Sequence, residues 1–278
     1  MPIEILVLHA ILAKGDIGPI VELRMNTQKA TASGKGHKKE SIEIALRSHS
    51  TRNYCLMSQL HTFTFNAFGE QTYLLDHGDG EATVFDPGMS HSAERESFKK
   101  RCEELGVVPV QCLLTHAHLD HVLGCGWLFD EWGLQPRLHP TDEITWEQAP
   151  RAAELYSVPM DTLPPRGEDL GPHGSKVLCG AMELEVRCAP GHSAGHVIFV
   201  CHAKKWVVGG DVLFQGSVGR TDLPGGDGLT LAKSIEQQLY SLPDMYEVWP
   251  GHGPSTTIGS EKSSNPFVNE NGGGILQR

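Results

Sequence analysis

The chain has 278 residues, and its content of 39% hydrophobic and 21% charged residues is ordinary for a globular protein. Its net charge is −11, with residues 1–56 at +3 (8 basic, 5 acidic) and residues 57–278 at −14 (15 basic, 29 acidic). Such an acidic body repels phosphate backbones, and no apolar run approaches the roughly 18–20 residues that cross a bilayer. We therefore predict neither a nucleic-acid nor a membrane partner.

The seven cysteines are odd in number and form no CxxC pair. This pattern is typical of reduced thiols in a cytosol rather than of a disulfide framework. The apolar stretch 3–13 has no basic residue ahead of it and no small-residue cleavage site after it, which argues against a secretory signal. We expect a cytoplasmic protein.

Residues 1–56 differ in character from the rest of the chain. Residues 26–53 are polar and weakly basic, with no aromatic residue and no sustained periodicity. Such a segment buries too little apolar surface to offset the entropy lost on ordering. Our hypothesis is a disordered extension over 1–56, with Met57 as a possible working start, followed by one folded domain over 57–278.

Short strands are predicted to open the folded domain, at 60–65, 71–76 and 81–86. A helix is predicted over 92–105, because apolar residues share one stripe and Gly106 follows as a stop. An apolar strand over 110–115 comes next and leads into a histidine cluster. A second helix is then predicted over 119–132, ending at Gly133.

Residues 140–175 are rich in proline and acidic side chains, which predicts a short helix and a surface loop. Three further strands are predicted, at 181–188, 196–201 and 205–209. Apolar residues at helical spacing predict a helix over 229–242, and a last strand over 246–250 leads to His252. Sequential hairpins flanked by helices predict an α+β layered sandwich, with two sheets inside and the helices outside.

The segment Thr115-His-Ala-His-Leu-Asp-His121 is the main chemical signal in the sequence. Alternate side chains of an extended chain share a face, so His116 and His118 can bind one ion. Asp120 and His121 lie past the turn at the start of a helix and can serve a second ion. Imidazole with carboxylate suits zinc, iron or manganese rather than magnesium or calcium.

Three more candidate ligands occur downstream at predicted strand ends, each beside glycine: His192, Asp211 and His252. Glycine allows the backbone to turn sharply and pack closely at such positions. His196 is predicted either to orient a ligand or to occupy a simple strand position. The other histidines are assigned no role, namely His61, His77, His91, His139, His173 and His202.

The order HxHxDH, His, Asp, His resembles the metallo-β-lactamase superfamily over about residues 57–267. The resemblance implies an αββα sandwich with two mixed sheets and helices on the outer faces. It also implies a first metal on His116, His118 and His192 and a second on Asp120, His121 and His252, with Asp211 bridging both. We expect two divalent ions per chain, with zinc favoured over iron or manganese.

Two metals sharing a water can make hydroxide available near neutral pH, and Asp120 can accept a hydrogen bond from this nucleophile and orient it, a catalytic role. Thioesters are natural substrates for such a site, because a thiolate with a pKa near about 8.5 needs little proton assistance to leave. The segments 209–227 and 257–267 resemble the short bacterial form of glyoxalase II, which hydrolyses S-D-lactoylglutathione.

In that family a basic residue nine positions after the bridging aspartate contacts the thiol carrier, and Arg220 occupies this position. An internal ion pair with Asp222 or Asp227 is an equally good interpretation of Arg220. Only 26 residues follow His252 (278 − 252), too few for the helical C-terminal domain of the longer glyoxalase II enzymes. A general thioesterase is therefore a safer prediction than a glutathione-specific one.

Two enzyme classes remain as alternatives. A persulfide dioxygenase resembles the chain at Gly219-Arg-Thr-Asp222, but it would use a single iron held by two histidines and an aspartate. A ribonuclease Z-like phosphodiesterase shares the ligand order, and the charge of the body argues against it. True β-lactamases usually lack the aspartate at the position of Asp211, so we do not favour lactamase activity. A non-catalytic binding module on the same fold would be free to lose its ligands, and the complete set argues against it.

Overall fold

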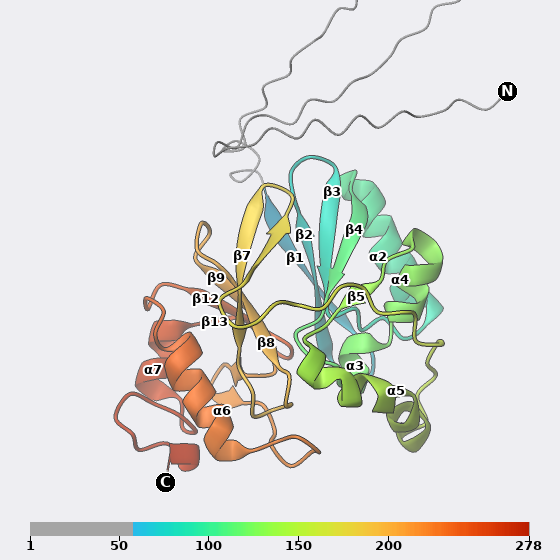
Figure 1. The fold of residues 1–278 in the computed structure, drawn as a ribbon. Helices are drawn as coiled ribbons and strands as arrows, with labels where there is room; N and C mark the ends of the chain where they lie inside the picture. The colour runs from blue at the N-terminus through green and yellow to red at the C-terminus, as the bar shows by residue number, and fades with distance from the viewer. Residues whose placement is uncertain (1–57, 278) are drawn as a thin grey trace, which may run out of the picture. The chain divides into compact units, whose positions relative to one another are not determined.

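The computed structural model describes residues 58–277, so the disordered extension expected over residues 1–56 lies outside the described residues. The described part contains two β-sheets that face each other, with helices on their outer sides (Figure 1). This arrangement confirms the predicted αββα sandwich with two mixed sheets. None of the helices within 58–277 is long and apolar enough to cross a membrane.

The first sheet has the strand order β1-β2-β3-β4-β5. Its strands are β1 (Gln59–Phe65), β2 (Glu70–Asp76), β3 (Glu81–Phe85), β4 (Val108–Leu113) and β5 (Pro136–Arg137). The first three strands pair antiparallel, whereas β4 lies parallel to both β3 and β5. Parallel neighbours need a crossover, and helix α2 (Ser92–Leu105) provides it between β3 and β4.

The second sheet has the order β13-β12-β9-β8-β7-β6. Its strands are β6 (Lys176–Cys179), β7 (Met182–Cys188), β8 (Val197–Cys201), β9 (Trp206–Gly210), β12 (Glu247–Pro250) and β13 (Thr256–Thr257). Strands β6 to β9 pair antiparallel, and β12 joins parallel to β9. As a result, β7, β9 and β12 run in the same direction and end at the same edge of the sheet.

Three apolar layers hold the sandwich together, and the alternation of side chains along each strand decides which layer a residue enters. In β2 and β3, Tyr73 and Phe85 face the second sheet, whereas Leu74 and Val84 face the α2 side. In the second sheet Phe199 points inward between the sheets. Its neighbours on β8 instead pack against the outer helical layer, which includes α6 (Gly228–Ser234), α7 (Ile258–Ser264) and the π-helical turn η2 (Ile235–Leu239).

The helix predicted over 119–132 is wrong as a single element, because it is divided into α3 (Leu119–Val122) and α4 (Cys125–Trp132). A continuous helix would need Gly124 N to donate to the carbonyl of Asp120. Instead Gly124 N donates to the Pro87 carbonyl at 2.7 Å, and the Asp120 carbonyl accepts from Asn66 Nδ2 at 3.0 Å. Because the helix breaks here, the backbone of Asp120 is held by Asn66 rather than by the next turn of a helix.

Other predicted elements differ in extent. The short helix predicted within 140–175 is α5 (Glu143–Tyr156), 14 residues long and preceded by the 3₁₀ turn η1 (Pro140–Asp142). Pro150 is accommodated inside this helix, whose buried face packs through Trp146, Ala149 and Ala153. The sequence patterns missed β6, α7, the 3₁₀ turn η3 (Ile275–Gln277) and the two-residue strands β5, β10 (Leu213–Phe214), β11 (Ser217–Val218) and β13.

Gly124→Ala is expected to destabilise the protein. A Cβ at this position would lie 2.1 Å from Met89 Sδ and 2.9 Å from the Pro87 carbonyl oxygen. Overpacking of this kind costs about 1–3 kcal/mol in free energy of unfolding, measured from urea denaturation. Gly273→Ala, where the nearest atom is 3.9 Å away, is the control and should change stability by less than about 0.5 kcal/mol. Equal stability of the two variants would contradict the packing argument.

Candidate metal centre

The two sheets bring the seven predicted side chains to one edge of the sandwich. Strand β4 ends just before the first two, α3 carries the next two, and β7, β9 and β12 each end before one more. Because β7, β9 and β12 point the same way, their following loops meet at one place. The seven residues are His116, His118, Asp120, His121, His192, Asp211 and His252.

The first group consists of three imidazoles from two distant loops. Nδ1 of His118 lies 2.8 Å from Nε2 of His192, which in turn lies 3.2 Å from Nε2 of His116. Burial lowers the pKa of His118 to about 3 and lowers the pKa of His116 well below its ordinary value. Neutral rings with converging nitrogens are the form in which histidine binds metals.

The second group contains one carboxylate and two imidazoles. Nε2 of His252 lies 3.1 Å from Oδ2 of Asp120, and Nε2 of His121 lies 3.7 Å from the same oxygen. Burial by itself would lower the pKa of His121, but the charges of Asp120 and Asp211 raise it well above its ordinary value. The group therefore attracts positive charge, which a proton or a metal cation can supply.

Asp211 lies between the two groups. Its Oδ1 is 3.4 Å from Nε2 of His121, and its Oδ2 is 3.4 Å from Nε2 of His192 and 3.5 Å from Nε2 of His252. Burial would raise the pKa of Asp211, but the nearby positive charge of His121, with smaller contributions from His192 and His252, holds the pKa well below its ordinary value. This carboxylate is ionised, and its oxygens lie between the two groups, with Oδ2 near a ring of each.

The donor atoms fit divalent cations. Within residues 58–277, His121 Nε2 and Asp211 Oδ1 are buried and make no hydrogen bond. Buried polar atoms are nearly always satisfied, so these two orphaned atoms need a partner that the protein does not provide. Nitrogen and carboxylate oxygen donors at this spacing suit zinc, iron or manganese. The cluster is thus a binding site for divalent metal, and its donors do not select among these three ions.

Hydrogen bonds behind the rings fix their tautomers. Nδ1 of His192 lies 2.8 Å from the carbonyl oxygen of Arg220, which only accepts hydrogen bonds, so Nδ1 carries the proton. Nδ1 of His121 faces the Asp86 carboxylate at 3.2 Å in the same way. In His192, and in the neutral form of His121 that can bind a metal, the lone pair is therefore on Nε2, the atom that points into the cluster. Such outer partners are a common feature of metal sites.

Asp86 supports the cluster, although the sequence analysis placed it only at the end of the predicted strand 81–86. Its carboxylate accepts hydrogen bonds from Thr115 N at 2.7 Å and from Thr115 Oγ1 at 2.6 Å. It thereby ties the end of β3 to the start of the histidine segment while it faces His121. An acidic residue that directly follows an apolar strand was the available signal.

Two more carboxylates support the cluster without being predicted. Asp142 accepts from Ala117 N at 2.7 Å and from Gly195 N at 3.0 Å, which joins the two loops that carry the first group. Glu70 is fully buried beneath the cluster, 4.0 Å from Nδ1 of His121, and burial raises its pKa well above the ordinary value. Neither position has a sequence motif that reveals its role.

His196 orients a candidate ligand, which decides between the two interpretations of its role. Its Nε2 accepts a hydrogen bond from Asp211 N at 3.0 Å, and its ring stacks on His116 with centroids 4.7 Å apart. Gly251 shows how closely the loops pack here. A Cβ on this residue would lie 2.1 Å from Asp211 Oδ1 and 2.7 Å from Cε1 of His121, so only glycine fits.

Arg220 forms a bidentate ion pair with Asp222. Its Nε and one terminal nitrogen donate to the two carboxylate oxygens, each at 2.7 Å, and both side chains are exposed. Asp227, the other candidate partner, instead caps α6 by accepting from Thr230 N at 2.7 Å. The predicted ion pair is therefore present with Asp222, and a substrate contact of Arg220 stays a prediction.

Residues 66–252 match the family model of the metallo-β-lactamase superfamily. The chain belongs to this superfamily. It is 38% identical to hydroxyacylglutathione hydrolase GloC of Haemophilus influenzae over 206 residues, which cover 73% of this chain and 94% of the relative. It is also 35% identical to the probable metallo-hydrolase YqgX of Bacillus subtilis, covering 69% of this chain and 89% of the relative.

Solved structures agree with this assignment. TTHA1623 in a di-iron-bound form has a TM-score of 0.68 and 38% identity, and the match covers 75% of this chain and all of that one (100%). The B3 metallo-β-lactamase BLEG-1 has a TM-score of 0.69 and 34% identity, with coverage of 76% and 99%. The protein therefore has bacterial relatives and solved structures of closely similar fold. It is a metal-dependent hydrolase of this superfamily.

Asp86→Asn is expected to weaken metal binding at the group that contains His121. The substitution keeps the side-chain size but removes the negative charge that holds the proton on Nδ1 of that ring. Loss of an outer partner typically lowers metal affinity about 10–100-fold, measurable by equilibrium dialysis with metal analysis. Asp169→Asn, at an exposed surface ion pair, is the control. Unchanged affinity in Asp86→Asn would contradict the assigned role.

Proposed function

We propose that the protein is a binuclear thioester hydrolase that acts on S-D-lactoylglutathione or a related acyl thioester. The observation that carries the proposal is the position of Asp211, whose carboxylate lies within 3.5 Å of ring nitrogens from both donor groups. A single-metal site would need no such bridging carboxylate. The relative named hydroxyacylglutathione hydrolase, at 38% identity, supports the choice of substrate class.

In this proposal His116, His118 and His192 hold one cation, and Asp120, His121 and His252 hold the other, with Asp211 shared by both. When bound, the two cations would lower the pKa of water toward about 7 and polarise the carbonyl group of a substrate. Zinc is our expected metal, and iron is the principal alternative because the similar protein TTHA1623 is described in a di-iron-bound form.

Asp120 is the proposed catalytic residue among the protein's own groups. Burial would raise its pKa, but the charge of His121 and the hydrogen bond to His252 lower it. Asp120 is therefore an ionised acceptor at neutral pH. Its side chain keeps 16% of its surface exposed, so its carboxylate can accept a hydrogen bond from the attacking water and orient it toward a carbonyl carbon.

The thiol carrier would be recognised outside the metal groups. Arg220 is proposed to contact it, because the carbonyl of this residue touches His192 while its guanidinium is exposed at the surface. A carboxylate of the carrier could compete with Asp222 for the guanidinium, since both would form the same bidentate geometry. No proton donor for the leaving group is required, because a thiolate leaves readily.

Two other reactions on this fold would use the donors differently. A persulfide dioxygenase would need one iron held by two histidines and an aspartate, so it would not use all seven donor side chains. A lactam ring, the substrate class suggested by the name of BLEG-1, is also a carbonyl compound open to attack. We favour thioesters because the retained Asp211 is the feature that the lactamases usually lack.

The proposed setting is the cytoplasm, with a small molecule as the substrate and neither nucleic acid nor a membrane as a partner. No disulfide joins any two of the six cysteines within 58–277, as is usual for proteins of a reducing compartment. The −14 charge of residues 57–278 would repel an RNA substrate.

Asp211→Asn is expected to abolish hydrolysis of S-D-lactoylglutathione and to reduce the metal content of the protein. The loss in kcat/KM should exceed about 100-fold, the upper end of the cost of losing an outer partner. Asp244→Asn removes an exposed carboxylate and serves as the control. Equal rates for wild type and Asp211→Asn would overturn the site. One iron per chain with sulfite formed from glutathione persulfide would overturn the hydrolase reaction instead.

Arg220→Ala is expected to raise KM for the glutathione thioester by about tenfold, the value of one charge-assisted contact, with little change in kcat. Asp222→Asn is the matched variant, because it frees the guanidinium and should leave KM unchanged or lower it. Steady-state kinetics on both variants separate the two interpretations. A similar KM for Arg220→Ala and wild type would mean that the ion pair is only structural.

A further inference from the structure

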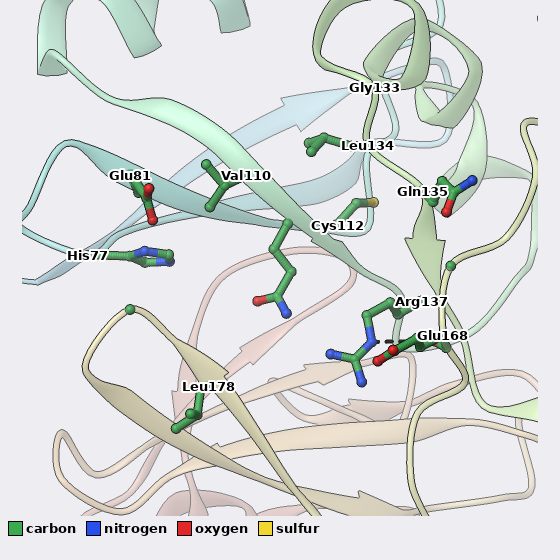
Figure 2. Close-up of a pocket in the computed structure, with 13 residues that line it drawn as sticks. His77, Glu81, Val110, Cys112, Gly133, Leu134, Gln135, Arg137, Glu168 and Leu178 are labelled. Atoms are coloured by element: carbon green, nitrogen blue, oxygen red, sulfur yellow. Dashed lines mark hydrogen bonds between the residues drawn. The ribbon is translucent and has the colours of Figure 1, made fainter. Parts of the chain in front are cut away.

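A second group of ligand-type side chains occupies the β2–β3 turn, at the opposite edge of the first sheet from the metal centre. His77, Asp79 and Glu81 each place one donor atom so that all three lie within 4.8 Å of one another. His77 and Glu81 also line a cavity of about 470 Å³ between the ends of the two sheets (Figure 2). The sequence analysis assigned none of them a role.

The tautomer of His77 follows from its neighbours. Thr83 Oγ1 donates its hydrogen to Oε1 of Gln111 at 3.0 Å, so the same hydroxyl must accept from Nε2 of His77 at 2.9 Å. Nε2 therefore carries the proton, and the lone pair is on Nδ1. Burial also lowers the pKa of His77, which keeps the ring neutral. The ring thus presents a free acceptor nitrogen toward Asp79.

That nitrogen has no partner. The side chain of His77 is 2% exposed, and Nδ1 makes no hydrogen bond to any residue within 58–277. The nearest charged atom is Oδ1 of Asp79, 4.0 Å away, which is an acceptor as well. Two acceptors facing each other repel unless a cation or a proton lies between them, and buried polar atoms are normally satisfied.

We propose that Nδ1 of His77 and the carboxylates of Asp79 and Glu81 form an additional divalent-cation site for an ion such as Zn²⁺ or Mn²⁺. One imidazole with two carboxylates is a donor set that these ions accept. With bonds of about 2.1 Å, two donors on one ion can be at most about 4.2 Å apart, and the pair His77–Asp79 meets this limit. Glu81 is exposed and free to close on the ion.

Glycine at position 180 keeps the side of the His77 ring next to the β6–β7 turn free of a side chain. Gly180, in the β6–β7 turn, lies against the ring, and a Cβ at this position would be 3.0 Å from Nδ1 and 2.8 Å from Cβ of His77. The charged neighbours of the ring are all acidic, namely Asp76, Asp79 and Glu81. Arg137 lies on another wall of the cavity, where its Nε donates to the Glu168 carbonyl at 3.3 Å (Figure 2).

The test compares wild type with the double variant Asp79→Asn/Glu81→Gln in equilibrium dialysis against Zn²⁺. Asp79 lies in the β2–β3 turn and Glu81 is the exposed first residue of β3, so the variant should fold, and circular dichroism checks this. The control is Glu96→Gln/Glu103→Gln on the exposed face of α2, which removes the same charge. We expect the turn variant to bind one zinc ion fewer per chain than wild type and the control, with unchanged thioester hydrolysis.

Equal zinc counts for wild type and the turn variant would overturn the proposal, as would an equal loss in the control. A crystal of the wild-type protein soaked in Zn²⁺ gives an independent measurement. Anomalous scattering at the zinc edge should place a peak within bonding distance of Nδ1 of His77. Absence of that peak in a crystal whose main metal centre is filled would also overturn the site. Neither result depends on which substrate the enzyme hydrolyses.

Discussion

Asp211 is a buried, ionised carboxylate, and the compensation of its charge is the constraint on which the rest of the site depends. A carboxylate in such a place is stable only with positive charge or several donors around it. The chain supplies imidazoles on both sides, yet Asp211 Oδ1 and Nε2 of His121 have no hydrogen-bond partner within residues 58–277. Cations would complete the arrangement, which agrees with the membership of the chain in a superfamily of metal-dependent hydrolases.

The fold serves this constraint by its strand directions. Three parallel-running strands of one sheet, β7, β9 and β12, end beside the C-terminal end of β4 in the other sheet, so loops from both sheets meet at a single edge. The backbone of these loops is held by carboxylates that are not part of the donor groups. Asp86 and Asp142 each accept two backbone or hydroxyl hydrogens from the loops around the histidines, which limits the freedom of the donors before any ion arrives.

The metal centre and the β2–β3 turn orient their histidine rings in the same way, although the carboxylates of the turn are more exposed than those of the centre. In each, a hydrogen bond on one ring nitrogen leaves the lone pair of the other nitrogen facing a carboxylate. At the centre the outer partners are the Arg220 carbonyl and Asp86, and at the turn the partner is Thr83. The turn has two exposed or half-exposed carboxylates instead of a buried bridge, so an ion there would be held more weakly and would exchange with solvent.

The sequence by itself determined the sandwich and the set of donors. Alternation in 60–65, 71–76 and 81–86 reports burial of one strand face, which is a local property, and β1, β2 and β3 lie within a residue or so of these ranges. The histidine segment 116–121 and the glycine-flanked His192, Asp211 and His252 could be recognised because the family order of ligands is written in the chain. From the sequence we expect these residues to converge, and the shared direction of β7, β9 and β12 explains why they do.

Only the tertiary structure decided which residues contact the donor side chains and their loops on the side away from the metal centre. Glu70, Asp86 and Asp142 belong to no motif, because their roles depend on residues 25 to 53 positions away in the chain. The division of the helix at Leu123-Gly124 likewise follows from hydrogen bonds to Pro87 and Asn66, which local propensity does not encode. His77 is the clearest case. Its sequence position predicts no role, whereas the structure shows that Thr83 and Gln111 determine its tautomer and that its Nδ1 is buried beside Gly180 without a hydrogen-bond partner within residues 58–277.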